Sequence, residues 1–197
     1  TGLKITKFKT MKILELLHSG SRALKLNRIE THQLDSELVL SSLLKKQREN
    51  LITNSDQKVS ENIVFNFEKL IARRANNEPL AYILKYKEFW SKDFFVDRNT
   101  LIPRPETELM VEGLAKHGKR QAKILDIGTG SGCIIISLLK ELKLATGIGI
   151  DICPKAISVA KRNARAHKIT NRIKFFRSSL ETIFFKNFDA KFDELVI

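Results

Sequence analysis

Three glycines and two aspartates in the middle of this sequence have the types and spacing of a cofactor-binding turn. Asp126 stands near the end of one apolar run, and Gly128, Gly130 and Gly132 follow it at alternate positions. A second apolar run ends at Asp151. Glycines let the backbone bend sharply and let a ligand lie against it without a Cβ in the way. The arrangement predicts a pocket for a nucleoside-bearing cofactor at the carboxyl edge of a parallel sheet.

The spacing of this loop favours S-adenosylmethionine over a dinucleotide. In dinucleotide-binding loops the third glycine comes three residues after the second, and Cys133 stands there in this chain. Asp126 suits the ammonium group of a cationic ligand better than a phosphate. Asp151 can accept hydrogen bonds from both hydroxyls of a ribose. The expected cofactor-binding residues of this stretch are Asp126, Gly128, Thr129, Gly130, Ser131, Gly132 and Asp151.

The elements that would hold the loop alternate between strand and helix. Short apolar runs predict strands, and longer amphipathic stretches predict helices. The expected order is strand 124–127, helix 134–142, strand 146–150, helix 154–167, strand 173–176 and strand 192–197. Such alternation is typical of a parallel sheet with right-handed crossovers.

Two further segments precede this domain. Leucine- and isoleucine-rich faces at helical spacing predict a helical bundle, with no strand-like alternation to compete. A Glu-Pro pair ends that pattern, and an aromatic stretch then predicts a β-hairpin linker. The expected fold is α/β, with a helical bundle over 1–76, a hairpin linker over 77–100 and a partial Rossmann-like domain over 101–197.

Composition argues against several classes of protein. No apolar run approaches the roughly 20 residues that span a bilayer, and the amino terminus lacks a secretory apolar block. The two cysteines and four histidines do not fall in metal-ligand spacing, so neither a metal site nor a disulfide framework is expected. These features favour a cytoplasmic protein without a membrane partner.

A formal net charge of +13 has two interpretations. Excess cations attract nucleic acid or a nucleic-acid-rich assembly. The densest groups, 45–48 and 73–74, are short and carry no interleaved aromatic residues. The pattern favours a solvated, lysine-rich surface over direct nucleic-acid binding without excluding it, and such a surface suits work near a ribosome.

Four blocks of residues match the pattern of one protein family. They are 78–84 (Glu-Pro-Leu-Ala-Tyr-Ile-Leu), 88–90 (Glu-Phe-Trp), 101–108 (Leu-Ile-Pro-Arg-Pro-Glu-Thr-Glu) and 126–133 (Asp-Ile-Gly-Thr-Gly-Ser-Gly-Cys). Together they resemble the HemK/PrmC family, the N5-glutamine methyltransferases of peptide-chain release factors. The resemblance covers nearly the whole chain.

The resemblance implies a helical substrate-recognition domain, a hairpin linker and a class I methyltransferase domain that uses S-adenosylmethionine. The implied reaction methylates the glutamine side-chain amide in the Gly-Gly-Gln loop of release factors. The resemblance also implies that Arg104 and Thr107 lie over the cofactor and that Leu180 borders its adenine.

The sequence departs from the family pattern at three places. Ser179 stands where the family has an acid, and Lys85 stands where a glycine is expected in the hairpin turn. The family's Asn-Pro-Pro-Tyr motif, which by resemblance holds the reacting amide, is absent, and residues 192–197 would lead directly into it. We therefore expect a truncated chain that has no catalytic residue of its own and transfers no methyl group alone.

Other functions stay open on the sequence. A nucleic-acid amino-methyltransferase, acting on tRNA or DNA, shares the cofactor loop and suits the basic surface, although the 101–108 block argues against it. A non-catalytic module that docks a translation factor would neither bind the cofactor nor transfer a methyl group. Some members of the family are fused to a tRNA guanine methyltransferase, so a second activity in the full gene also stays open.

Overall fold

The computed structural model describes residues 10–179 and 192–196 of the chain. The chain divides into two compact units, Thr1–Leu84 and Lys85–Ile197. The division falls within the expected linker over 77–100, with its first part in the helical unit and its hairpin in the second unit. Within the described residues, no helix is both long enough and apolar enough to cross a membrane.

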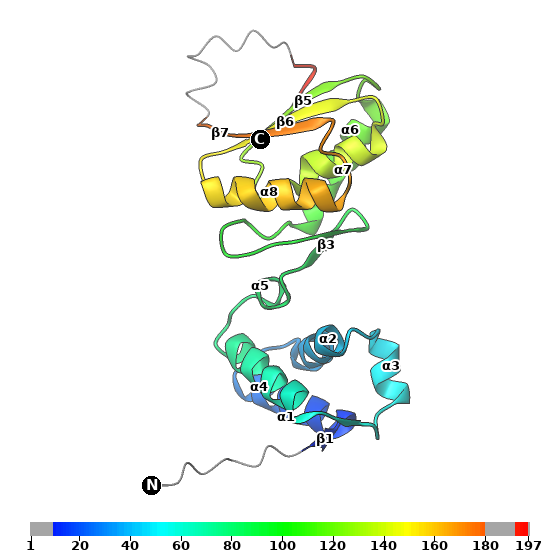
Figure 1. Ribbon diagram of the computed structural model, residues 1–197, viewed down its shortest axis with the longest axis vertical. Coiled ribbons are helices and arrows are strands. Elements are labelled where there is room, and N and C mark those ends of the chain that lie inside the picture. Colours follow the sequence, from blue (N-terminus) through cyan, green and yellow to red (C-terminus); the bar gives the residue numbers. More distant parts are fainter. Residues whose placement is uncertain (1–9, 180–191, 197) are drawn as a thin grey trace. The chain divides into compact units, whose positions relative to one another are not determined.

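The first unit consists of helices and one short antiparallel ladder (Figure 1). Its elements are β1 (Met11–Lys12), α1 (Ile13–Leu26), α2 (His32–Leu44), α3 (Arg48–Thr53), β2 (Lys58–Val59), α4 (Glu61–Ala75) and α5 (Leu80–Leu84). The ladder pairs Met11 with Val59 and was not expected, because two-residue strands show no alternation. The apolar faces of α1, α2 and α4 meet around Leu16, Leu40 and Phe67, which are fully buried.

The second unit is built on a four-stranded parallel sheet. Its elements are β3 (Lys87–Phe89), β4 (Lys92–Phe94), η1 (Pro105–Thr107), α6 (Glu108–His117), β5 (Lys123–Ile127), α7 (Cys133–Glu141), β6 (Thr146–Asp151), α8 (Pro154–Ala166), β7 (Ile173–Arg177) and β8 (Glu194–Val196). The strand order is β7-β6-β5-β8, and every neighbouring pair is parallel. The expected α/β fold with a partial Rossmann-like domain is confirmed.

The two faces of this sheet have different surroundings. On one face, Ile124 and Phe175 pack with α6, α7 and α8 in the main core. On the other, Leu125 and Ile150 are buried in a smaller apolar cluster with Phe192. Successive side chains of a strand point to opposite faces. The described helices of this unit therefore cover one face of the sheet.

The hairpin of β3 and β4 packs on the main core of the second unit. Phe89 and Phe94 are buried there, with ring centroids 6.2 Å apart in an edge-to-face arrangement. The turn Trp90–Ser91 has φ of 53° and 50°, the conformation that Asn-Gly pairs usually supply. Trp90 N donates to Glu108 Oε1 at 2.8 Å, and Trp90 Nε1 donates to Glu141 Oε1 at 3.0 Å. These hydrogen bonds to α6 and α7 stabilise a turn whose positive φ angles are unfavourable for Trp and Ser.

The start of the expected hairpin linker is helical. The short helix α5 occupies residues 80–84, and Lys85 follows it directly with φ of 60°. Helices often end in one left-handed residue, most often glycine. The glycine expected at Lys85 would therefore end a helix, and the hairpin turn lies further on. The alternating aromatic and aliphatic residues Tyr82, Leu84 and Tyr86 resemble a strand pattern, which explains the difference.

Candidate functional site

The glycine loop joins β5 to α7 at the carboxyl end of β5. The chain adds β6 and β7 on one side of β5 and then returns to place β8 on the other side. Ligands of open α/β sheets bind where the strand order reverses in this way, just beyond the carboxyl ends of the strands. Residues 128–132 and Asp151 both lie at this edge, because β5 and β6 run parallel in register.

All three glycines of the loop adopt left-handed backbone conformations. The φ angles are 74° at Gly128, 52° at Gly130 and 78° at Gly132. Residues with a Cβ adopt such angles only at a cost. A Cβ on Gly132 would lie 3.3 Å from the Cβ of Ala160 on α8, whereas a Cβ on Gly128 would meet nothing within 4 Å. The loop thus packs closely against α8 and leaves open space beside Gly128.

Asp126 carries a buried carboxyl group directly before the loop. The residue is 2% exposed, and its Oδ2 accepts a hydrogen bond from Thr129 Oγ1 at 2.7 Å. Burial raises the pKa of Asp126 to about 6; the Thr129 hydroxyl and the Ile135 backbone oppose this shift, and the charge of Asp151 adds to it. A cation next to this group would favour its ionised form.

Asp151 is fastened to the loop by its side chain. Its Oδ2 accepts from Gly130 N at 3.0 Å, and its Oδ1 accepts from Cys153 N at 2.8 Å. Thr129 N donates to the carbonyl of Ile150 at 2.8 Å, which joins the loop to β6 a second time. Each carboxylate oxygen keeps a lone pair for a further donor. The structure therefore brings the predicted residues Asp126, Thr129, Gly130 and Asp151 into one hydrogen-bonded group.

The hydroxyl of Ser131 is buried in the loop, next to the thiol of Cys133. Cys133 follows it at the start of α7, and burial raises the pKa of its thiol to about 12. The thiol is neutral near pH 7 and packs in the core, so it does not serve as a nucleophile.

Asn163 on α8 also supports the loop, although nothing in the sequence marks it. The residue is 1% exposed. Its Nδ2 donates to the carbonyl of Ser131 at 2.8 Å and to that of Phe95 at 2.9 Å, and its Oδ1 accepts from Phe95 N at 2.9 Å. One side chain thus ties the glycine loop, α8 and the strand end after the hairpin together. Its partners are backbone atoms far away in the chain, so no motif reveals it.

Two further predicted residues, Arg104 and Thr107, are not joined to this group by a hydrogen bond. Arg104 is exposed, and Thr107 N donates to its carbonyl at 3.1 Å within η1. Among the described residues, neither side chain forms a hydrogen bond to the glycine loop. Leu180 lies outside the described residues. The assignment of these three residues to the cofactor stays a prediction.

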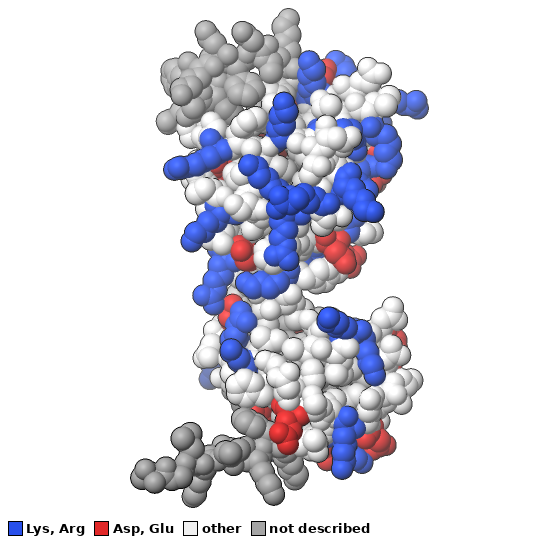
Figure 2. Space-filling model, in the orientation of Figure 1, with Lys and Arg blue, Asp and Glu red and all other residues white. Residues whose placement is uncertain are grey.

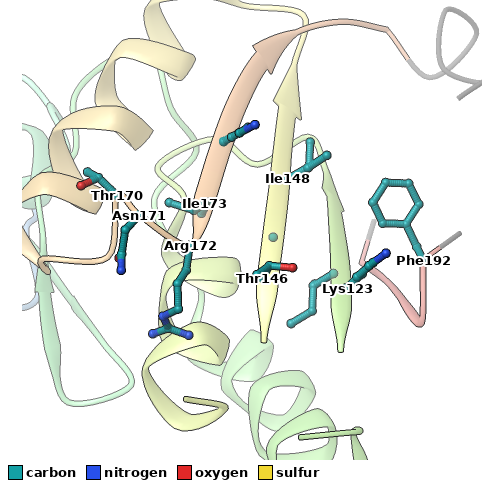
Figure 3. A pocket seen from close by; sticks show the side chains of 11 residues that line it. Lys123, Thr146, Ile148, Thr170, Asn171, Arg172, Ile173 and Phe192 are labelled. Atoms are coloured by element: carbon teal, nitrogen blue, oxygen red, sulfur yellow. The ribbon is translucent and has the colours of Figure 1, made fainter. Parts of the chain in front are cut away.

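A separate hollow lies at the other edge of the sheet (Figure 3). Lys123, Thr146 and Arg172 line it at the starts of β5, β6 and β7, together with Ile148 and Phe192. The strands of a parallel sheet all begin at the same edge. The hollow is therefore at the opposite end of the strands from the glycine loop, and we do not include it in the candidate cofactor site.

Two family models match the chain. A PrmC N-terminal domain model matches residues 15–84, and a methyltransferase domain model matches residues 118–197. The first match falls within the helical unit and the second within the sheet unit.

Curated relatives match across both units. A release factor glutamine methyltransferase of Buchnera aphidicola subsp. Baizongia pistaciae is 39% identical over 94% of this chain and 66% of its own length. A protein of the same name from Nitratidesulfovibrio vulgaris is 38% identical over 85% of this chain and 57% of its own length. A bifunctional methyltransferase of Rickettsia conorii is 36% identical over 87% of this chain and 38% of its own length. The chain thus spans between 38% and 66% of the length of these relatives. Because both of its units match and this identity extends over most of its residues, the chain belongs to the HemK/PrmC family of methyltransferases.

Proposed function

We propose that the chain binds S-adenosylmethionine at the glycine loop, and that the whole protein methylates the glutamine side-chain amide in the Gly-Gly-Gln loop of peptide-chain release factors. The observation that carries the cofactor proposal is the hydrogen-bonded group of Asp126, Thr129, Gly130 and Asp151 at the carboxyl edge of the sheet. The substrate proposal is supported by the relatives named release factor glutamine methyltransferase. Release factors are then the protein partner, with a cytoplasmic site of action near the ribosome.

Each residue of the group has a distinct proposed role. Gly130 N and Cys153 N hold the Asp151 carboxylate so that its remaining lone pairs accept the two ribose hydroxyls. The carboxyl group of Asp126 ionises in response to the ammonium group of the ligand. The open space beside Gly128 leaves room for the ligand to lie against the backbone. When bound, the cofactor supplies an electrophilic methyl group on a sulfonium centre.

The same group of residues disfavours a dinucleotide. A pyrophosphate at this loop would lie next to the two carboxyl groups of Asp126 and Asp151, and like charges repel. A sulfonium nucleoside carries positive charge and has no phosphate, so both carboxyl groups favour it.

The substitution Asp151→Ala tests the cofactor site. We expect S-adenosylmethionine to bind about 1.5–3 kcal/mol more weakly, the worth of hydrogen bonds to a charged group, as measured by titration calorimetry. The matched control is Glu112→Ala, which removes an exposed acid of α6 that pairs with Lys116 and should leave the affinity unchanged. Thermal melts of both variants separate lost binding from lost folding. Unchanged affinity in Asp151→Ala, or NADH bound in place of S-adenosylmethionine, would contradict the proposed cofactor site.

A transfer assay tests the reaction separately from binding. The 197-residue chain and a full-length relative are incubated with a release factor and radiolabelled S-adenosylmethionine. We expect label in the factor with the relative and none with the chain, because the sequence contains no Asn-Pro-Pro-Tyr motif. Label transferred by the chain alone would contradict the expectation that it is inactive. A chain that binds no cofactor and transfers no label would instead be a docking module.

A further inference from the structure

The outer surface of α8 and the neighbouring strand β7 carry cations without any acid. No Asp or Glu occurs from residue 152 to residue 179. The cations of this stretch are Lys155, Lys161, Arg162, Arg165, Lys168, Arg172, Lys174 and Arg177. They are separated along the chain, so no basic block stands out in the sequence, but the helical repeat gathers them on one side. Figure 2 shows Lys and Arg side chains collected over this part of the second unit.

Most of these cations lack a counter-charge. Five of them are exposed, and their side chains form no ion pair or hydrogen bond with any described residue: Lys155, Lys161, Arg165, Lys168 and Lys174. Elsewhere in the same unit, surface lysines do have acidic partners, such as Lys116 with Glu112 and Lys119 with Asp193. Like charges one helical turn apart repel one another and lower stability. An anionic partner would remove this repulsion.

A groove between α8 and β7 lies within this surface. Lys161 and Arg165 line it from the helix, and Lys174, Phe175 and Phe176 line it from the strand. Phe175 is buried in the core on the α8 side of the sheet, whereas Phe176 is 47% exposed and its side chain points to the opposite face, so its ring lies at the edge of the groove. Cations around an exposed aromatic ring are the combination that binds single-stranded nucleic acid, because the cations contact phosphates and a base stacks on the ring.

We propose that the α8–β7 surface, made of Lys155, Lys161, Arg165, Lys168, Lys174 and Phe176, binds single-stranded RNA. The thirteen residues of α8 extend over about 20 Å, which accommodates several phosphates. A membrane fits less well, because the exposed positions of α8 after Pro154 hold only Lys, Arg, Ser and Ala. The exposed large apolar side chains beside the helix, Ile152 and Phe176, are single residues and do not form the apolar face that inserts into a membrane. An acidic protein would match the charge but leave the ring of Phe176 without a stacking partner. The proposal goes beyond methylation and does not depend on cofactor binding.

Fluorescence anisotropy of a labelled, unstructured RNA of about 20 nucleotides tests the proposal over about 50–300 mM NaCl. The full chain should bind, and its affinity should fall steeply with salt. The triple variant Lys161→Gln, Arg165→Gln, Lys174→Gln should bind at least about tenfold more weakly at low salt and lower the salt slope by about 2, as expected for three lost phosphate contacts.

The matched control removes the same charge from the helical unit. Lys25→Gln and Lys69→Gln change exposed helical positions, and Lys58→Gln changes an exposed strand position. This control should keep RNA affinity within about twofold of the parent chain, if binding depends on the location of charge and not on its total. Equal losses in the two triple variants would overturn the proposal.

The ring is tested by its own pair of variants. Phe176→Leu should weaken RNA binding at least about fivefold, because an aliphatic side chain does not stack on a base, and Phe176→Tyr should restore it. Ultraviolet cross-linking of the unmodified chain to the RNA, with the site mapped by mass spectrometry, gives a result that needs no variant to fold. Cross-links confined to residues outside 152–179 would contradict the proposal.

Two competing partners complete the test. An acidic peptide that displaces the RNA without sensitivity to Phe176→Leu would assign the surface to protein binding and overturn the proposal. Binding to vesicles with anionic headgroups, without binding to RNA, would overturn it in favour of a lipid surface. Absence of RNA binding even at the lowest salt would also end it.

Discussion

Among the described residues, each of the two units buries one aspartate, and the two carboxyl groups have opposite surroundings. In the helical unit, Asp35 is 4% exposed and its Oδ2 lies 2.7 Å from Nε of Arg74. In the sheet unit, Asp126 is 2% exposed and accepts a hydrogen bond from the neutral hydroxyl of Thr129, with no Lys or Arg of the described residues paired to it. The first charge is neutralised within the fold and the second is not.

This difference separates a structural carboxylate from one that is available to a ligand. A buried charge needs a counter-charge or must neutralise itself. Asp35 has its cation, so it links α2 to α4 and has no capacity for a further charged partner. Asp126 lacks one, and burial raises its pKa to about 6. A cationic ligand at the glycine loop would supply the missing charge, which supports our proposal that Asp126 belongs to a cofactor site.

The largest expected effect on stability comes from breaking the ion pair between Asp35 and Arg74. Asp35→Asn leaves the guanidinium of Arg74 without its counter-ion, since this cation is largely buried. We expect the free energy of unfolding to fall by about 3–5 kcal/mol, measured by urea denaturation of the whole chain. The control is Asp56→Asn, which disrupts an exposed pair with Lys12 and should leave the transition unchanged. Equal urea midpoints for Asp35→Asn and the parent would show that the ion pair does not contribute to stability.

Removing the amide of Asn163 tests the neutral bonds that hold the glycine loop. Asn163→Ala leaves the carbonyl of Ser131 and both backbone groups of Phe95 without their partner. Buried groups that lose a hydrogen bond retain their desolvation cost, so we expect a loss of about 3 kcal/mol in the free energy of unfolding. Cofactor affinity should fall as well. The control is Asn66→Ala, which removes a solvent-exposed hydrogen bond from Asn66 Nδ2 to the carbonyl of Asn62 within α4. It should change neither stability nor affinity.

Neutralising Asp126 should have the opposite sign to neutralising Asp35. The folded-state pKa of about 6 lies above the ordinary aspartate value of about 3.8, so the protein loses stability as the pH rises between these values. Asp126→Asn removes that cost. We expect its free energy of unfolding to exceed that of the parent by about 2–3 kcal/mol at pH 7 and to differ little from it near pH 4. Its affinity for S-adenosylmethionine should fall. Destabilisation at pH 7 would mean that Asp126 has a cation partner in solution.

The smallest expected effect concerns backbone strain at Lys85. This exposed residue ends α5 with φ of 60°. Glycine adopts that angle without the steric cost of a Cβ but loses more entropy on folding. We expect Lys85→Gly to raise the free energy of unfolding by about 0.5–1 kcal/mol, the balance of these two effects. Lys87→Gly, in β3, lacks the left-handed angle and should destabilise; a gain there too would point to charge instead of strain.

The sequence predicts those parts of the fold whose signal is local. The alternation of apolar runs and glycine turns indicates β5, α7, β6, α8 and β7 to within a residue or two, because each element repeats its own period. The ladder of β1 and β2 is too short to show a period. Residues 80–84 look like a strand although they form α5, since five residues barely exceed one helical turn.

The candidate site divides in the same way. The glycines and Asp151 are visible in the sequence because they sit at fixed offsets from strand ends. Asn163 is not, because its partners are backbone atoms brought to it by folding. The cations of α8 are also hidden, since a basic surface on a helix is spread over many positions in the chain. Local spacing therefore reveals the loop, whereas its supports depend on long-range contacts.

The strained hairpin turn has a practical consequence for experiments. Trp90 is the only tryptophan of the chain, and its indole N–H donates a hydrogen bond to Glu141 in the sheet unit. Its fluorescence emission therefore reports on that unit without any added dye. Far-ultraviolet circular dichroism, in contrast, records helices from both units. A denaturation curve followed by both signals would show directly whether the two units melt together or one after the other.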